Sequence, residues 1–319
     1  MSSVAEDLTR IGLGTATLGN LYRVMSDQDA YAAVETAWQL GVRYFDTAPH
    51  YGLGLAERRL GAALRDRPRA EFLMSTKVGR LLVPTPDNIN QLDDDGFAVP
   101  AAFRREWDFS RDGVLRSLES SLERLDLDRV DIAFLHDPDR HWVQASTTGV
   151  GALVELRDQG VVGAIGVGMN QSAMAAEFVR RCDIDLVMLA GRYTLLDQSA
   201  EGDLLSIAQQ RGVGIIAAGV YNSGLLGTDT VRADAHFDYR VASQEVVARA
   251  RAIAEVCHRH GVSLPDAAVQ FPLRHPAVLS VVLGARDGTQ IREGIERSEA
   301  PIPEAMWDQL ETDGLIRAS

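Results

Sequence analysis

The sequence predicts a (β/α)₈ barrel with long loops at the C-terminal ends of its strands. Short apolar runs rich in Val and Ile alternate with longer amphipathic segments, a pattern typical of a parallel sheet covered by helices. Glycine repeatedly separates an amphipathic segment from the apolar run that follows it. The 319 residues contain no repeat, low-complexity tract or linker, so we expect a single barrel domain over residues 1–319.

Eight apolar runs supply the predicted strands. Each run is short, and most are apolar on both faces, as buried parallel strands usually are. The predicted strands are IGLGT (11–15), VRYFDT (42–47), FLMSTKV (72–78), VDIAFLH (130–136), AIGVGM (164–169), LVMLA (186–190), VGIIAAG (213–219) and VLSVVLG (278–284).

The segments between the strands carry signals for the start and end of helices. Ser26 and Ser110 precede two of these segments and are good N-cap residues. Glycines that favour a left-handed helix end stand at positions 41, 160, 212 and 261. The predicted helices lie near residues 27–40, 55–65, 110–125, 150–159, 171–181, 203–211, 244–260, 264–273 and 289–297.

An open, doubly wound sheet is the alternative fold. Such sheets usually carry a GxGxxG fingerprint after the first strand. In GLGTATLG the glycines stand at positions 12, 14 and 19, which is a different spacing. The closed barrel is therefore the preferred prediction.

Composition restricts the class of protein. The formal net charge is −13, from 45 acidic and 32 basic residues, which argues against a nucleic-acid or anionic-membrane partner. Cys182 and Cys257 have no metal-like spacing and cannot make a disulfide framework. MSSVAEDLTR lacks a signal-peptide pattern, and no apolar run approaches about 18 residues, so we expect a cytoplasmic protein.

Two connections are longer than a barrel turn requires. Residues 79–109 follow the third predicted strand, and residues 222–243 follow the seventh. Loops of this length are uncommon unless they are functional or disordered. Both leave the C-terminal ends of strands, where the active sites of barrels lie.

Polar residues gather at the ends of three consecutive predicted strands. Asp46, Lys77 and His136 end these strands, and Tyr51 follows Asp46 by five positions. Each residue alone has an ordinary explanation as a cap, a solvated side chain or a rim residue. In a closed barrel, however, the three strand ends are adjacent, so the four side chains can converge. Lys77 also needs a counter-charge within its apolar run, and Asp46 can supply it.

Together the four side chains predict proton transfer to or from an oxygen atom. The pKa of a phenol is about 10, and a neighbouring ammonium lowers it. A carboxylate can hold the ammonium, and a histidine can orient the reacting oxygen. Such a set complements hydride transfer at the attached carbon. It offers no activated Ser or Cys nucleophile and too few ligands for a metal, so we expect no metal site.

The motifs resemble those of a known enzyme family. GLGTATLG, FDTAPHYG, STKVG and DIAFLHDP, in this order, resemble the aldo-keto reductases, and the similarity runs from about residue 10 to about residue 296. The resemblance implies a (β/α)₈ fold, a nicotinamide cofactor, and catalytic roles for Asp46, Tyr51, Lys77 and His136. APHYG, AGRYTLLDQ and NSGLL further resemble a branch of bacterial dehydrogenases that act on L-fucose and D-threo-aldoses at C1, which also includes a pyridoxal 4-dehydrogenase.

The resemblance also implies cofactor contacts after several strands. Thr15 and Ala16 match a contact after the first strand. Asn170 stands one place from the family's asparagine after the fifth strand. Tyr221 is expected to replace the aromatic residue that stacks on nicotinamide, because the aligned position is Ala218.

The remaining implied contacts concern the phosphates. Ser223 and the amide of Leu225 lie in NSGLL, which resembles the pyrophosphate-binding loop. Gly284 and Gln290 stand where NADP-binding members carry a lysine and an arginine, whereas Arg286 remains basic. NAD is therefore expected in preference to NADP.

The expected reaction is oxidation of a sugar at C1 to a lactone, with His50, Trp107 and Trp142 as substrate-binding residues. One alternative is a pyridoxal 4-dehydrogenase or a general aldehyde or ketone reductase. The other is a nucleotide-sensing binding protein, which the complete set of four catalytic residues disfavours. The expected partner is a small-molecule substrate rather than nucleic acid or a membrane, and the chain is expected to be a monomer or a small homo-oligomer.

Overall fold

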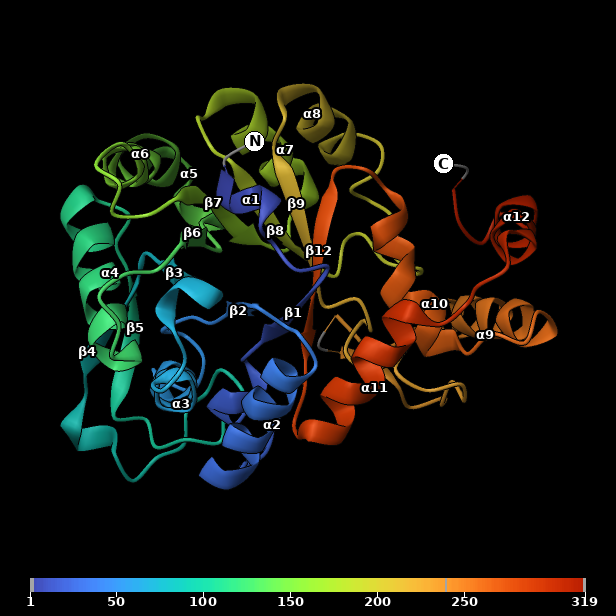
Figure 1. The fold of residues 1–319 in the computed structure, drawn as a ribbon, viewed down its shortest axis with the longest axis horizontal. Coiled ribbons are helices and arrows are strands. Elements are labelled where there is room, and N and C mark those ends of the chain that lie inside the picture. The colour runs from blue at the N-terminus through green and yellow to red at the C-terminus, as the bar shows by residue number, and fades with distance from the viewer. Residues whose placement is uncertain (1–2, 239, 318–319) are drawn as a thin grey trace.

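The predicted closed barrel is present in the computed structural model, which describes residues 3–238 and 240–317. Positions 1–2, 239 and 318–319 of the predicted domain, and hence residue 239 of the connection 222–243, lie outside the described residues. Parallel strands close in the order β1-β12-β9-β8-β7-β6-β3-β2 (Figure 1). These strands are β1 (Ile11–Gly14), β2 (Tyr44–Asp46), β3 (Leu73–Val78), β6 (Ile132–His136), β7 (Ala164–Met169), β8 (Leu186–Ala190), β9 (Gly214–Ala218) and β12 (Val278–Gly284).

Helices surround the strands on the outside of the barrel (Figure 1). The predicted helices are confirmed as α2 (Asp27–Gln39), α3 (Leu55–Leu64), α4 (Arg111–Leu125), α6 (Val150–Asp158), α7 (Ser172–Arg181), α8 (Leu204–Arg211), α9 (Gln244–Arg259), α10 (Leu264–Gln270) and α11 (Gly288–Glu299). The sequence pattern does not predict the short α1 (Ser3–Glu6) and α5 (Trp142–Gln144), or α12 (Glu304–Thr312). In the described part of the chain, no helix is long and apolar enough to cross a bilayer.

The predicted helix ends are also confirmed. The Ser26 side chain accepts a hydrogen bond from the amide of Asp29, and that of Ser110 accepts one from the amide of Gly113. These bonds satisfy amides that have no partner inside the helix. Left-handed backbone occurs at the glycines predicted to follow helices, which are Gly41, Gly160, Gly212 and Gly261.

Two apolar layers stabilise the barrel. Side chains that point inward fill its interior, among them Tyr44, Phe134 and Met188. Ala5 of α1 packs against this interior layer. Neighbouring strand residues such as Phe45 point outward into the larger core between strands and helices, as the alternation of a strand requires.

The connection 79–109 contains regular secondary structure. It contains an antiparallel hairpin of β4 (Arg80–Pro84) and β5 (Phe103–Trp107). Phe97, between these strands, is buried against Leu53 and Tyr51. The second long connection contains the small hairpin of β10 (His236–Phe237) and β11 (Arg240–Val241). The first connection therefore covers the barrel next to one of the predicted catalytic residues.

Candidate active site

The turn after β2 fixes the position of Tyr51. The amide of Tyr51 donates to the carbonyl of Ala48 at 3.1 Å, which closes a tight turn. Gly52 has a φ of +61°, and a Cβ on it would lie 2.3 Å from the carbonyl oxygen of Gly19. Only glycine tolerates both the left-handed backbone and this close approach. The glycine-rich segment therefore lets the phenol lie beside the ends of β2 and β3.

Lys77 joins the predicted catalytic residues of β2 and β3. Its Nζ atom lies 2.5 Å from Oδ2 of Asp46 and 3.2 Å from the phenolic oxygen of Tyr51. It also donates to the carbonyl oxygen of Thr47 at 3.0 Å. Lys77 and Asp46 are both buried. All three N–H donors of the ammonium thus have acceptors, which offsets the cost of burying the charge.

In the buried pair of Lys77 and Asp46, each charge stabilises the ionised form of the other side chain. Burial lowers the pKa of Lys77, but Asp46 and Tyr51 more than compensate, so the net change is a rise and the amine stays protonated. Burial raises the pKa of Asp46, whereas the charge of Lys77 and hydrogen bonds from Lys77 and Ser75 oppose the rise. An ammonium next to the phenol is therefore a permanent feature of the site at neutral pH.

The pKa of Tyr51 corrects one expectation. Burial raises the pKa of the phenol, and although Lys77 lowers it as predicted, the net pKa lies above 10. Asp46 and Asp137 add to the rise through their negative charges. The expected net lowering is therefore wrong for the protein alone, because sequence reasoning considered the ammonium without the burial. At neutral pH the phenol is protonated and can donate a proton.

His136 completes the predicted set. Its ring lies 5.9 Å from the ring of Tyr51, between centroids. Burial, followed by the charges of Arg80 and Lys77, holds the pKa of His136 well below its usual range. The imidazole is thus neutral at pH 7, and its one ring N–H can donate to a ligand oxygen. Nδ1 is buried and has no hydrogen-bond partner among the described residues.

The chain next to His136 is held by an arginine that sequence reasoning missed. Asp137 follows His136 with a φ of +41°, and its amide donates to the carbonyl of Gly168 at 2.8 Å. Arg80 forms an ion pair with the Asp137 carboxylate. Arg80 directly follows STKVG, so its place just beyond a strand end is the signal that points to it.

His50, predicted to bind substrate, lies beside both the phenol of Tyr51 and the ring of His136. Its ring centroid is 5.9 Å from that of Tyr51 and 5.5 Å from that of His136. Arg105 of β5 donates to Nδ1 of His50 at 2.6 Å. Sequence reasoning did not single out Arg105, which reaches the site only through the β4–β5 hairpin.

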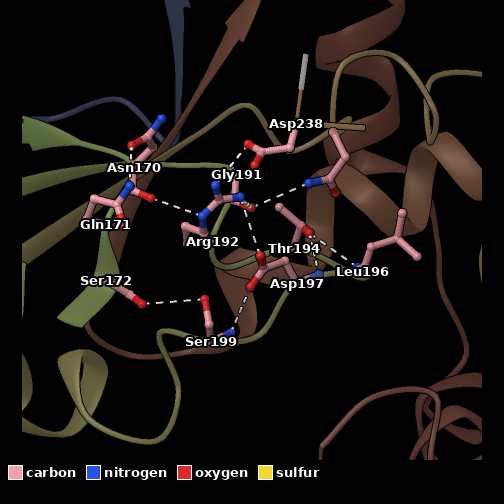
Figure 2. A network of polar contacts seen from close by, with 11 residues as sticks. Asn170, Gln171, Ser172, Gly191, Arg192, Thr194, Leu196, Asp197, Ser199 and Asp238 are labelled. Carbon is pink, nitrogen blue, oxygen red and sulfur yellow. Dashed lines mark hydrogen bonds and ion pairs between the residues drawn. The ribbon is translucent and has the colours of Figure 1, made fainter. Parts of the chain in front are cut away.

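A second polar network lies beyond the ends of β7 and β8 (Figure 2). The Arg192 guanidinium donates to the carbonyl of Asn170 at 2.9 Å and lies 3.4 Å from Asp197 and 2.8 Å from Asp238. Asp238 belongs to the connection after β9. Arg192 therefore ties that connection to the end of β7, next to the predicted cofactor residue Asn170.

A small pocket opens next to Arg192. Ala190, Gly191 and Gly219 leave room in its wall because they have little or no side chain. Asn222 donates from Nδ2 to the carbonyl of Gly191 at 3.4 Å, whereas its Oδ1 is buried without a partner among the described residues. The lining residues are Asn170, Ala190, Gly191, Arg192, Gly219, Asn222, Ser223 and Asp238.

The other predicted cofactor contacts follow β1 and β9. The Thr15 hydroxyl donates to the carbonyl of Asp46 at 2.9 Å, and Ala16 begins the turn that follows. The Tyr221 hydroxyl accepts a hydrogen bond from Arg297 at 3.3 Å. Leu225 has a buried side chain.

The predicted adenosine-phosphate contacts follow β12. Arg286 donates from Nη2 to the carbonyl of Leu21 at 2.7 Å, and its own amide donates to Oε1 of Gln290 at 2.9 Å. Nη1 of Arg286 is buried and has no partner among the described residues. Gly284 ends β12, and a Cβ on it would lie 3.8 Å from Thr17. Arg286 thus presents at this end a guanidinium nitrogen whose two N–H groups no described residue satisfies.

The two tryptophans lie in different surroundings. The ring of Trp107, at the end of β5, is exposed and stacks on His141 at 6.3 Å between centroids. The ring of Trp142 packs edge-on against Phe178 of α7 at 4.7 Å. Trp142 lines a cavity with Met174, Arg181 and other residues, none of which belongs to the predicted catalytic set. Contact of either tryptophan with substrate stays a prediction.

Within the described residues, no group of three or more His, Cys, Asp or Glu side chains is placed to hold a metal ion. The four side chains predicted to be catalytic are a phenol, an ammonium, a carboxylate and a neutral imidazole. Such an arrangement can pass one proton to or from an oxygen held between Tyr51 and His136.

Comparison with known proteins points to one family. The model of the aldo/keto reductase family matches residues 10–312. A D-threo-aldose 1-dehydrogenase of Pseudomonas sp. is 46% identical over 96% of this chain and 94% of its own length. A pyridoxal 4-dehydrogenase of Microbacterium luteolum is 41% identical over 97% of this chain and 95% of its own.

Solved structures agree on the fold. The holo form of the aldo-keto reductase AKR11C1 from Bacillus halodurans has a TM-score of 0.74 at 24% identity, covering 98% of this chain and 93% of its own. The glycerol dehydrogenase AKR11B4 from Gluconobacter oxydans has a TM-score of 0.77 at 22% identity, covering 98% and 94%.

Proposed function

Because this chain belongs to the aldo/keto reductase family and is an oxidoreductase, we propose that it oxidises an aldose at C1 to a lactone with NAD. The identity of 46% to a D-threo-aldose 1-dehydrogenase, over nearly the full length of both chains, supports a sugar of the L-fucose or D-threo-aldose type. The contact of Lys77 with both Asp46 and Tyr51 is the observation that carries the proposed chemistry.

Each catalytic residue has a role set by its surroundings. Tyr51 accepts the proton of the C1 hydroxyl during oxidation and donates it during reduction, while Lys77 stabilises the phenolate. Asp46 holds Lys77 in place. His136, being neutral, donates a hydrogen bond to the same substrate oxygen. A bound nicotinamide supplies the hydride acceptor, so that loss of one hydride from C1 and one proton from its oxygen leaves the lactone.

The protein's own groups fit a nicotinamide cofactor at two places. The pocket at the ends of β7, β8 and β9 contains a buried acceptor, Oδ1 of Asn222, that no described residue satisfies. The end of β12 offers the unpaired Nη1 donor of Arg286. Buried polar atoms without partners are rare in proteins and mark places where a ligand can supply the missing bond. The residues proposed to contact the cofactor are Thr15, Ala16, Asn170, Tyr221, Ser223, Leu225, Gly284, Arg286 and Gln290.

The preference for NAD follows from the charge at the β12 end. Gly284 and Gln290 are neutral. The Gln290 side chain accepts a hydrogen bond from the backbone amide of Arg286, so it supplies no positive charge for a phosphate. Arg286 alone remains to meet a 2′-phosphate, and one of its nitrogens already donates to Leu21. A single guanidinium that already donates one hydrogen bond within the protein binds a phosphate weakly.

A second candidate substrate is pyridoxal, supported by the identity of 41% to a pyridoxal 4-dehydrogenase. The experiment that separates the two is a panel of L-fucose, D-arabinose, pyridoxal and nitrobenzaldehyde, assayed with both cofactors in both directions. We expect NAD-dependent oxidation of one or both sugars to have the largest kcat/KM. A larger kcat/KM for pyridoxal or nitrobenzaldehyde would reject the sugar proposal while leaving the family chemistry intact.

A further inference from the structure

An arginine and an aspartate outside the predicted catalytic set hold the His50 ring in one tautomer. Arg105 of β5 makes a two-pronged ion pair with Asp93, at 2.5 Å from Nη1 to Oδ1 and 3.0 Å from Nη2 to Oδ2. Both side chains are almost fully buried, with 4% and 2% exposed. Such a bidentate pair fixes the plane of the guanidinium, because both hydrogen bonds must form at the same time.

Two further donors of Arg105 are directed at His50, while Nη1 also lies 3.1 Å from Oδ2 of Asp95. Nε lies 2.6 Å from Nδ1 of His50, and Nη2 lies 3.1 Å from its carbonyl oxygen. Arginine can only donate, so Nδ1 of His50 must be the acceptor and the ring proton must lie on Nε2. Arg105 therefore selects one neutral tautomer of His50.

The electrostatics agree with this assignment. Burial and the charges of Arg80, Arg105 and Lys77 lower the pKa of His50 to about 2. The ring is thus a fixed, uncharged N–H donor throughout the pH range of an assay. The protonation state of His50 could not be predicted from the sequence around it, because it depends on a residue fifty-five positions away.

The Nε2–H group of His50 has no partner inside the described protein. The ring is packed edge-on against Phe97, at 5.2 Å between centroids, and lies beside Tyr51 and His136. Arg105 occupies Nδ1, and no hydrogen bond from Nε2 to another described residue is present. The two histidines therefore present two neutral N–H donors next to one phenol.

We propose that His50 donates a hydrogen bond to a substrate oxygen on the carbon next to the reacting carbon, and that Arg105, held by Asp93, is the positioning residue for this donor. The site would thus select substrates with two adjacent oxygens, one held by His136 and Tyr51 and the other by His50. This inference deepens the proposed function and rests on it only for the choice of a sugar, because any carbonyl compound with an adjacent hydroxyl offers the same pair of oxygens.

The test compares matched substrates that differ in the adjacent oxygen. Wild-type protein is assayed on L-fucose and 2-deoxy-L-fucose as oxidations, and on D-glyceraldehyde and propanal as reductions. The variants are His50→Phe, which keeps a flat ring without the donor, and Arg105→Met, which removes the tautomer lock. Arg104→Met is the control, because Arg104 is the neighbour of Arg105 in β5 but its side chain is 56% exposed.

We expect His50→Phe to lower kcat/KM for the hydroxylated member of each active pair by about tenfold, mainly through KM, and to leave the other member nearly unchanged. Arg105→Met should show the same selective loss, and Arg104→Met none. Equal losses for both members of a pair, or an unchanged preference in His50→Phe, would overturn the inference. If wild type oxidises no sugar, the proposed function fails, but the reductive pair still decides the role of His50.

Discussion

The Nζ atom of Lys77 lies 3.2 Å from the phenolic oxygen of Tyr51, in a place where burial alone would make the phenol a very weak acid. Lys77 lies near the end of β3, whereas Tyr51 follows β2. The Asp46 carboxylate accepts a hydrogen bond from Lys77 and holds its ammonium in place. Because of this contact, the charge of a buried ammonium lowers the pKa that burial gives the phenol. The pH dependence of catalysis should therefore report on this pair.

The first prediction concerns pH. Because the pKa of Tyr51 is raised above 10, the phenol is protonated at neutral pH, and oxidation requires it to lose that proton. With cofactor and sugar saturating, kcat for oxidation should rise between pH 7 and pH 10, whereas kcat for reduction should stay flat and then fall at the alkaline end. An oxidation rate that decreases over this range would contradict a role for Tyr51 as the proton acceptor.

The second prediction concerns the stability of the buried ion pair. Lys77→Met leaves the Asp46 carboxylate buried without its cation, and the free energy of unfolding should fall by about 3 kcal/mol. Since burial raises the pKa of Asp46, an unpaired Asp46 can take up a proton in mild acid, and the loss should be smaller at pH 5 than at pH 8. Urea denaturation at the two pH values measures both effects.

The double variant Asp46→Asn, Lys77→Met is the control for that experiment. It removes the stranded charge, so it should recover much of the stability lost in Lys77→Met and lose its pH dependence. It should still lack activity. A double variant as unstable as Lys77→Met at pH 8 would mean that lost packing, rather than the stranded carboxylate, causes the instability.

The third prediction uses two glycines that share a left-handed backbone. Gly41 has a φ of +86° and open space where a Cβ would lie, whereas a Cβ on Gly52 would collide with the backbone of Gly19. Gly41→Ala should therefore cost only the backbone strain, about 1 kcal/mol of unfolding free energy. Gly52→Ala should cost more and should also reduce turnover, since it displaces the turn that carries Tyr51. Equal effects on stability and turnover would show that the close approach to Gly19 is unimportant.

Most of the barrel could be predicted because its strands are apolar on both faces and end in turn formers. The runs AIGVGM, LVMLA and VLSVVLG match the observed β7, β8 and β12 residue for residue. The β4–β5 hairpin could not be predicted in this way. RLLVP ends in proline and FRREW is mostly charged, and the two pair across a long intervening segment, so neither shows the apolar pattern of a barrel strand.

The same hairpin explains why Arg105 escaped prediction. Arg104 and Arg105 are adjacent and chemically identical in the sequence. Only the alternation of a strand places one outward and the other inward against Asp93 and His50. The candidate catalytic residues could be identified because each lies at, or shortly after, the C-terminal end of a strand. The pKa of Tyr51, in contrast, depends on burial that no local pattern reveals.

The fourth prediction concerns the cofactor. Wild type should have a larger kcat/KM with NAD than with NADP, and Gln290→Arg should raise the value with NADP by about tenfold while changing that with NAD little. Gln290→Ala is the control, because it also removes the acceptor of the Arg286 amide but adds no charge. A wild type that uses NADP about tenfold better than NAD, or equal effects of the two variants, would contradict the assignment.

The central claim is that the Tyr51 phenol carries the proton, and the substitution Tyr51→Phe tests it most directly, since it removes one oxygen and keeps the ring packed against Phe97. Single-turnover reduction, followed by the loss of nicotinamide absorbance at saturating carbonyl substrate, measures the chemical step, and titration of protein fluorescence measures cofactor binding. We expect the Tyr51→Phe rate to be lower by at least about a hundredfold, with cofactor affinity unchanged. A single-turnover rate within about threefold of wild type would contradict the claim.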